Sequence, residues 1–451
     1  MLKIEKSFIG KDTLKTYNDI VRMLENHPWV KVNDKGYLKI YTLNFKEFSN
    51  WLKTAEGTKY SCKGCGDDSI YTVSEFLRTY MPRGLAVYDD GIDFFVIRGF
   101  RKFTGIDSTD EDEDSGATYT RESFMYNGST MGNCSYFVST EKSNGENGKW
   151  AIRRCKDGSY IIFAGSKNAM RYWKLGETIE FDLSKYIPSE EICKWVYNYC
   201  QTMSDEFLNI IVENEFTLMF EINHPDSEHV FPIDEMRMDF VSILDSNGLP
   251  IDCKTAFGFF SQFKLPHVSY SIHSQDQLNE IIQITRNRTD TEGIVIYLYN
   301  AENECIGLIK VKTDYYVVAR AIRECFKHFQ NKVFQGKLID GPIQNKKIKN
   351  QDKTLTIDVF LEVEKRIKKR MWNMNHLHNY KERYLEWIES GLIFLNYWKT
   401  NYLCLSTNET RIQYVHESKQ KYGTLFHNAM QNHKYMIVDE FVNEFMDSLF
   451  V

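Results

Sequence analysis

The spacing of apolar residues changes most clearly near residue 321, and this change constrains the fold of the chain more than any other feature. Between residues 84 and 316, apolar residues occur in short runs that end at turn signals, such as the Asp-Asp-Gly at 89–91, which is the pattern of β-strands. Beyond about residue 321 they recur every three or four positions, which is typical of amphipathic helices. The sequence therefore predicts an α+β fold of antiparallel sheets with flanking helices, followed by an all-helical C-terminal domain.

Three regions follow from this pattern. A length of 451 residues suits two or three domains of roughly 150 residues each. We expect an N-terminal mixed region over 1–80 that packs on the central domain, a strand-rich domain over 81–325 and a helical domain over 326–451. Within the first region, the pattern predicts helices at 13–26 and 72–80 and a strand at 37–43.

Composition limits the class of protein and its compartment. The chain is 42% hydrophobic with a net charge of −6, so it can form a real core, and any nucleic-acid contact must use a local basic surface. Charges near the N-terminus argue against a secretory signal, and no run of about 18 apolar residues predicts a membrane span. We expect an intracellular protein, cytoplasmic or nuclear and not secreted, with reduced cysteines. Cys62 and Cys65 lack the second pair of a zinc site, so a turn with two free thiols is favoured.

A lysine at position 142 has the surroundings that a nucleophile towards a nucleotide phosphate needs. The segment 139–147 reads Ser-Thr-Glu-Lys-Ser-Asn-Gly-Glu-Asn, and Gly145 lets the backbone pass close to a ligand. The side chains of Asn144 and Glu146 can orient a ribose or a metal-bound water. An amine attacks only when neutral, so its pKa of about 10.4 must be lowered by neighbouring cations or by burial.

Other charged residues in predicted strands could complete such a site. Lys310 and Lys312 leave the same face of one strand and could clamp a triphosphate. Glu221 and Glu292 lie in or beside apolar strands, where a carboxylate needs Mg²⁺, a ribose hydroxyl or a lysine. Arg98 could hold a phosphate bidentately. Taken alone, each is explained more simply by a solvated strand edge or a structural ion pair.

The order of these residues resembles that of the covalent nucleotidyltransferases, the superfamily of ATP-dependent ligases and mRNA capping enzymes. The segment EKSNGEN resembles motif I, LMFE motif III, EGIVI motif IV and LIKVKTDYY motif V. The likeness is nearest to the tRNA-repair RNA ligase of T-even phages and the ligase domain of fungal tRNA ligases, and it covers roughly residues 80–320. This resemblance implies that 81–325 is an adenylyltransferase or ligase domain.

Further segments strengthen the resemblance to this RNA ligase group, and some residues depart from it. Arg83-Gly84 precedes a strand, the segment 98–103 matches the Arg-x-x-x-Lys-Phe element, and Ser166-Lys167 matches the Ser-Lys of the strand after motif I. The departures are Thr104 for a second Phe, Asn144 for Asp and Glu146 for Ser or Cys. An acidic run at 107–114 is an insert that we interpret as a solvated loop.

The resemblance implies a role for each matching residue. Lys142 would form the Lys-AMP adduct, with Lys310 and Lys312 as further catalytic residues, and an apolar side chain near Phe240 would stack on adenine. The implied ATP-binding residues are Arg98, Lys102, Lys142, Lys167, Glu221, Phe240, Lys310 and Lys312, and the implied metal ligands are Glu292 and Glu221.

The implied function is that of an ATP-dependent RNA ligase acting through Lys-AMP and an adenylylated RNA end, in RNA or tRNA repair or splicing. The implied cofactors are ATP and Mg²⁺, with Mn²⁺ as a substitute. The implied partners are RNA with 5′-phosphate and 3′-hydroxyl ends, tRNA being one candidate, and a separate end-healing kinase or phosphatase; a monomer without membrane contact is expected. The basic residues 365–370 would contact RNA, although a solvated helix face explains them equally well. The alternatives are a capping guanylyltransferase, a DNA ligase or a non-catalytic RNA-binding pseudo-ligase.

Overall fold

The computed structural model describes residues 17–56, 70–71, 74–105, 124–334, 363–369 and 384–433. The chain forms two compact units, of which the first comprises Met1–Asn223 and Arg237–Thr313 and the second His224–Met236 and Asp314–Val451. The acidic run at 107–114, Cys62 and Cys65 lie outside the described residues.

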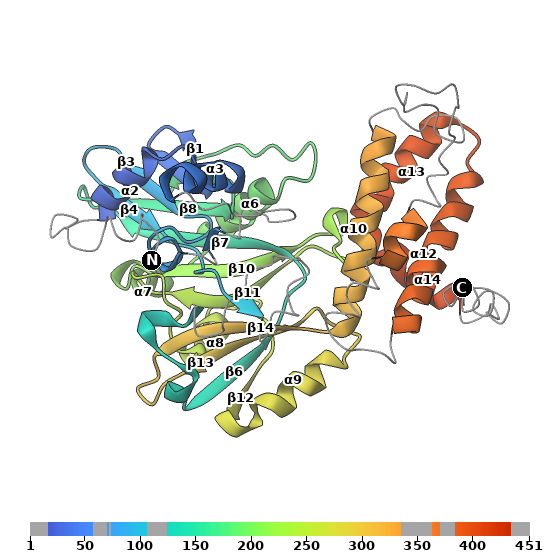
Figure 1. Cartoon of the computed structure of the whole chain (residues 1–451). Helices are drawn as coiled ribbons and strands as arrows, with labels where there is room; N and C mark the ends of the chain where they lie inside the picture. Colours follow the sequence, from blue (N-terminus) through green and yellow to red (C-terminus); the bar gives the residue numbers. More distant parts are fainter. Residues whose placement is uncertain are drawn as a thin grey trace. The chain divides into compact units, whose positions relative to one another are not determined.

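The N-terminal part of the first unit is a small sheet with its own core (Figure 1). Its strands, in the order β1-β2-β3-β4, are antiparallel. Trp29, which is fully buried, contacts Phe48 edge-on. Since β2 pairs with β3, residues on both sides of position 80 share one sheet, and the structure has no unit boundary there. The elements are α2 (Tyr17–Glu25), β1 (Val30–Lys35), β2 (Leu38–Leu43), α3 (Phe45–Glu56), α5 (Glu75–Tyr80), β3 (Ala86–Asp89) and β4 (Phe94–Ile97).

A five-stranded antiparallel sheet, in the order β11-β10-β7-β8-β9, carries much of the core of the first unit. Helix α6 packs on β8 and β7, and α7 packs on β7. The fully buried Trp150 of β7 stacks on Phe207 of α7 at a ring-centroid distance of 5.2 Å. The elements are β7 (Glu146–Arg154), β8 (Tyr160–Ser166), β9 (Met170–Lys174), α6 (Pro188–Cys200), α7 (Asp205–Glu213), β10 (Thr217–Asn223), β11 (Arg237–Leu244) and α8 (Cys253–Gln262).

A second five-stranded sheet, in the order β12-β6-β13-β14-β5, completes the first unit. Its central pairings are antiparallel, and the two-residue strand β5 runs parallel to β14. Helix α9 packs on β14 and β13. The elements are β5 (Thr104–Gly105), β6 (Tyr136–Glu141), β12 (Tyr270–Ser274), α9 (Leu278–Arg286), β13 (Gly293–Tyr299) and β14 (Cys305–Lys312), with short 3₁₀ helices at Tyr126–Gly128, Met131–Asn133 and Gln275–Gln277.

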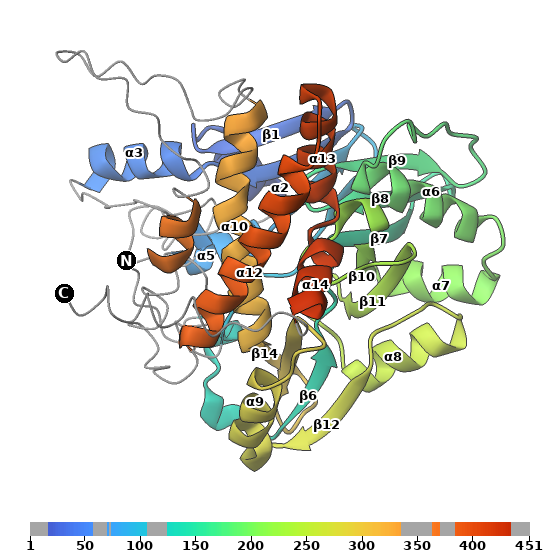
Figure 2. The ribbon, with the colours of Figure 1, turned by 90° about the vertical axis from the view of Figure 1, so that its right-hand side faces the viewer.

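The described part of the second unit is helical. Figure 2 shows its four labelled helices side by side, and their contacts agree with that view. Buried Trp398 donates a hydrogen bond to Ser418, which joins two of the helices. These helices are α10 (Asp314–Phe334), α12 (Tyr384–Leu403), α13 (Asn408–Gln420) and α14 (Tyr422–His433), with one further helical stretch at 363–369 and a 3₁₀ turn at Pro225–Ser227.

The division into units differs from the predicted boundary at 325/326. It falls at Thr313/Asp314, because α10 begins directly after β14 and packs with the C-terminal helices. The segment 224–236, which connects β10 to β11, also belongs to the second unit, where Val230 joins the helical core. Sequence reasoning missed this segment because it is short and lies between two strands of the first unit.

The predicted fold class is confirmed: the chain is α+β, with antiparallel and mixed sheets flanked by helices and a helical C-terminal region. None of the described helices has the length and apolarity that a bilayer crossing requires.

A buried glutamate should be critical for the second unit. Glu228 is 2% exposed and accepts hydrogen bonds from the Thr424 backbone N–H at 2.7 Å and the Thr424 hydroxyl at 2.8 Å. Glu228→Ala leaves these donors without a charged acceptor, so we expect the free energy of unfolding to fall by about 2–3 kcal/mol. Chemical denaturation measures this, with the exposed Glu235→Ala as control; equal effects of the two substitutions would contradict the prediction.

Candidate active site

The register of the second sheet aligns Lys142 with Lys312. Gly293 pairs with Lys312 on one side, and its carbonyl accepts the backbone N–H of Lys142 at 2.9 Å on the other. The row two residues further along β13 contains Thr140, Val295 and Lys310. Since alternate residues of a strand share a face, and neighbouring strands lie about 4.8 Å apart, three lysines gather on one face of β6, β13 and β14.

Glycine is required at the centre of this arrangement. Gly293 has a φ of +142°, and a Cβ built there would meet the carbonyl oxygen of Val311 at 2.0 Å. The missing side chain therefore allows the close pairing of β13 and β14 beside Lys312.

The amine of Lys142 forms an ion pair with Glu292, the residue that directly precedes β13. Lys142 Nζ lies 3.0 Å from Glu292 Oε1, and the two side chains are 18% and 6% exposed. The preceding residue, Glu141, accepts hydrogen bonds from Arg288 at 2.5 Å and from Thr291 at 2.8 Å. These contacts tie the end of β6 to the segment that leads into Glu292, so the lysine and its carboxylate are positioned by the same connection.

Glu221 joins the site from the other large sheet. Its Oε2 accepts the backbone N–H of Gly145 at 3.1 Å. Burial is the main cause that raises the pKa of Glu221 to about 7; the charge of Lys142 opposes this rise, and the charge of Glu292 adds to it. The carboxylate is therefore close to half-protonated at neutral pH, and bringing a cation to it would stabilise its charged form.

A hydrogen-bond network fixes the residue that follows Lys142. The hydroxyl of Ser143 donates to Asp239 Oδ2 at 2.7 Å, and Asn223 Nδ2 lies 2.8 Å from that hydroxyl and 2.7 Å from Asp239 Oδ2. Asp239 also accepts from Arg237 Nε at 3.1 Å. Since Ser143 and Asn223 are buried, this network holds the loop after the lysine against the ends of β10 and β11.

The side-chain amide of Asn144 is not satisfied by hydrogen bonds within the described part of the chain. Both polar atoms of its side-chain amide are buried without a hydrogen-bond partner, and Asn223 Oδ1 is in the same state. Unpaired buried amides are rare and costly in native proteins. Donors and acceptors of this kind, next to Lys142 and Gly145, suit the hydroxyls of a ribose, so the residues present fit a bound nucleoside.

Other predicted site residues are distributed over the same unit. Lys102 is 8% exposed and lies just before β5, the strand beside Lys310. Lys167 directly follows β8, and its backbone lies against Gly84. Arg98, by contrast, donates to the carbonyl oxygen of Ser246 in the turn after β11. The structure thus brings Lys142, Glu292, Glu221, Lys310 and Lys312 together.

Phe240 does not have the role implied by the resemblance. It is fully buried, and its ring contacts those of Phe220, Trp195 and Phe260 at centroid distances of 4.9, 5.7 and 5.3 Å. The expectation that Phe240 stacks on adenine is therefore corrected, because core side chains occupy its surroundings and none of its surface is exposed.

The carboxylates fit Mg²⁺ only together with a nucleotide. Within the described residues, no group of three or more His, Cys, Asp or Glu converges as a metal site. In enzymes that use nucleotides, Mg²⁺ is commonly bound by one or two carboxylates, several waters and the phosphates of the substrate. The implied ligands Glu221 and Glu292 match that mode and do not form a preorganised metal cage.

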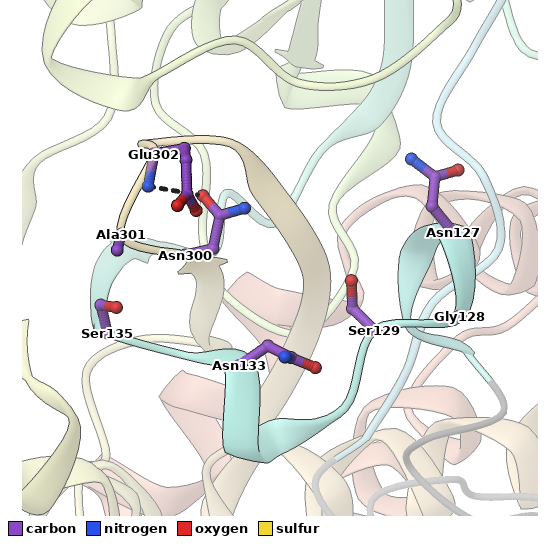
Figure 3. A pocket seen from close by; sticks show the side chains of 8 residues that line it. All are labelled: Asn127, Gly128, Ser129, Asn133, Ser135, Asn300, Ala301 and Glu302. Atoms are coloured by element: carbon purple, nitrogen blue, oxygen red, sulfur yellow. Dashed lines mark hydrogen bonds between the residues drawn. The ribbon is translucent and has the colours of Figure 1, made fainter.

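A polar hollow elsewhere in the unit is separate from this site (Figure 3). It has a volume of about 360 Å³ and is lined by Asn127, Gly128, Ser129, Asn133, Ser135, Asn300, Ala301 and Glu302. The turn at 300–302 follows β13 at the end opposite Gly293, roughly 20 Å along the strand. Its lining holds amides, hydroxyls and one acid but no cation, so it does not suit a phosphate.

Sequence reasoning missed the residues that support the lysine. Ser143, Asn223 and Asp239 belong to the network described above, and Lys149 is a buried lysine of β7 with no hydrogen-bond partner for its amine. An acid inside the apolar strand 237–244 was a visible signal for Asp239. Nothing in the pattern around Lys149 distinguishes it from a surface lysine.

No protein-family model matches this chain, and no curated protein is significantly similar to it. The resemblance to the covalent nucleotidyltransferases therefore depends on the motif residues.

The pH dependence of stability should reveal the buried carboxylate. The pKa of Glu221 is about 7 in the folded protein and about 4.3 in an unfolded chain, so the folded state binds more protons between these values. Its contribution to stability is therefore lost as the pH rises through 7. Glu221→Gln, which keeps an oxygen for Gly145, should raise the melting temperature at pH 8 and change it little at pH 5. The exposed Glu213→Gln is the control, and an equal effect of Glu221→Gln at both pH values would contradict the raised pKa.

Removing Asp239 should loosen the loop after Lys142. Asp239→Ala takes the acceptor from Ser143, Asn223 and Arg237, and we expect the free energy of unfolding to fall by about 1–3 kcal/mol. Denaturant titration checks this, with Glu213→Ala as the matched surface acid. An unchanged midpoint would show that the network contributes nothing to the fold.

Proposed function

We propose that this chain is an ATP-dependent RNA ligase that joins an RNA 3′-hydroxyl to a 5′-phosphate through a lysine-AMP intermediate. The observation that carries the proposal is the state of Lys142. Its amine is mostly buried, lies 3.0 Å from Glu292 and belongs to the same row as Lys312. The side-chain amide of Asn144, which is unpaired within the described residues, lies two residues after the lysine that would carry the adenylate.

In the first step, the amine of Lys142 attacks the α-phosphorus of ATP. An N–P bond forms, the bond to the bridging oxygen breaks, and pyrophosphate leaves with that electron pair. Because attack requires the neutral amine, the ammonium must first lose a proton, and Glu292 at 3.0 Å is within reach to accept it. The nitrogen then gives up a second proton to water once the N–P bond has formed. The carboxylate that pairs with the lysine thus becomes its base.

The neighbouring lysines would stabilise the charge that develops on the phosphates. Lys310 and Lys312 share the face of Lys142, and Lys312 is 3% exposed, so little water screens it. Fixed cations in a shielded site stabilise the transition state of phosphoryl transfer because they need not reorganise. Mg²⁺ bound with ATP would neutralise phosphate charge beside Glu221 and Glu292.

Two further transfers complete the reaction. A 5′-phosphate oxygen of RNA attacks the phosphorus of Lys142-AMP, which forms a 5′–5′ phosphoanhydride and releases the lysine. The 3′-hydroxyl of the second RNA end then attacks the 5′-phosphate, which forms the phosphodiester and releases AMP. Both transfers would use the charged groups around Lys142, because in each of them an oxygen attacks a phosphorus bound beside this lysine.

The first step can be tested directly. The purified protein is incubated with ATP labelled at the α-phosphate and with Mg²⁺, and denaturing electrophoresis follows. We expect label on the wild-type chain and none on Lys142→Ala, whereas Lys174→Ala, at an exposed lysine of the same unit, should be labelled like the wild type. No label on the wild type, or equal label on Lys142→Ala, would end the proposal.

The choice of nucleotide and ends separates the related activities. Labelling by GTP in preference to ATP would indicate a capping guanylyltransferase, and sealing of DNA ends alone would indicate a DNA ligase. RNA binding without any labelling would indicate a non-catalytic protein. A ligase of the proposed kind uses ATP and seals RNA ends that carry 5′-phosphate and 3′-hydroxyl groups.

A further inference from the structure

Lys149 is a buried lysine whose amine has no hydrogen-bond partner among the residues that the structure describes. It lies in the middle of β7 and is 1% exposed. Lysines are almost never fully buried unless they are paired, because removing an ammonium from water without compensation is costly. The other buried cation of this strand, Arg153, donates hydrogen bonds to the carbonyl oxygens of Ile152 and Phe216. Lys149 thus lacks what its neighbour has.

The position of Lys149 relates it to the candidate active site. Lys149 pairs with Met219 of β10. Asn147, which is two residues nearer to the candidate site on β7, pairs with Glu221. Residues two apart on a strand share a face and lie roughly 7 Å from each other. Lys149 therefore lies on the face of β7 that carries Asn147, one row behind Glu221, and its four-carbon stem can turn towards that row.

The Lys149 amine is bordered by the backbone of two segments that are separate in the sequence. A Cβ built on Gly84, which has a φ of +73°, would lie 3.3 Å from Lys149 Nζ and 2.7 Å from the carbonyl oxygen of Lys167. The amine is therefore enclosed by the chain at Gly84 and Lys167. An ammonium shielded from water in this way binds an anionic phosphate strongly.

We propose that Lys149 is a phosphate-binding residue, which turns forward to an anionic phosphate held at the face shared with Asn147. The identity of that phosphate, either the polyphosphate of the nucleotide or the 5′-phosphate of RNA, rests on the proposed function. The existence of the anion site does not, because it follows from the unpartnered amine and its surroundings.

Binding at Lys149 should carry a proton signature. Burial lowers the pKa of Lys149 to about 7. The strand register brings the ionisable side chain of Glu221 one row away on the same face, and the segments that contain Arg83 and Lys167 pass beside the amine. A phosphate against the amine stabilises the ammonium form, so binding at pH 8 should take up a proton at Lys149, up to about one per site. At pH 6 the amine is already charged, and this uptake should vanish.

The test is calorimetric titration of the full chain with inorganic pyrophosphate, and separately with a short RNA bearing a 5′-phosphate. Buffers of different ionisation enthalpy give the proton count at pH 6 and pH 8. Lys149→Met should weaken binding of the responding ligand about tenfold or more and remove the extra proton uptake at pH 8. The exposed Lys174→Met should change neither. The arm that responds identifies the source of the phosphate.

A loss of binding in Lys149→Met is informative only if the variant is folded, and we expect it to be. Lys149→Met removes an uncompensated buried amine, so its melting temperature at pH 7 should equal or exceed that of the wild type, and Lys149→Gln provides a second folded variant. Unchanged affinity and proton uptake for both ligands in Lys149→Met would overturn the inference. Absence of lysine labelling with an intact, Lys149-dependent anion site would refute the ligase and leave this inference standing.

Discussion

The ion pair between Lys142 and Glu292 depends on how β6, β13 and β14 are paired. Gly293 lies between the lysine and β14, and its carbonyl accepts the backbone N–H of Lys142. On the side of β14, the backbone N–H of Thr313 donates a hydrogen bond to the carbonyl oxygen of Glu292 at 3.0 Å. One short piece of backbone therefore sets the position of the nucleophile candidate, of its carboxylate and of the strand that carries Lys310 and Lys312. A shift of one residue in this register would turn the lysines to the opposite face.

The sequence was informative where a local pattern determines the structure. The alternation of Lys310 and Lys312, the apolar run around Glu221 and the turn at 89–91 each predicted an element that the structure contains. It was uninformative about long-range contacts. The hydrogen bonds from Ser143 and Asn223 to Asp239 join three separated segments, and burial of Phe240 depends on helices α6 and α8. The isolation of Lys149 is likewise a property of the folded chain, since a lysine within a strand does not show from the sequence alone whether its amine is exposed.

Several groups in and beside the candidate site are in energetically unfavourable states in the unliganded protein. Burial moves the pKa of Glu221 up to about 7 and that of Lys149 down to about 7, and the amide of Asn144 has no partner. Each of these states costs free energy in the unliganded protein. Sites that bind ligands commonly contain such destabilised groups, because a bound ligand can then supply the missing charges and hydrogen bonds. Three such residues lie on neighbouring segments in this part of the first unit.

The chain passes between its two units at three places, after Asn223, before Arg237 and after Thr313. Each crossing adjoins the candidate site, since β10 ends at Asn223, β11 begins at Arg237 and β14 ends at Lys312. A truncation after Thr313 would therefore not yield an isolated strand-rich unit. It would leave the excursion 224–236 behind, with Val230 and Glu228 deprived of the helices that bury them. Excising the helical part cleanly requires replacing that excursion with a tight β-hairpin connection, which must still bring Asn223 to Asp239.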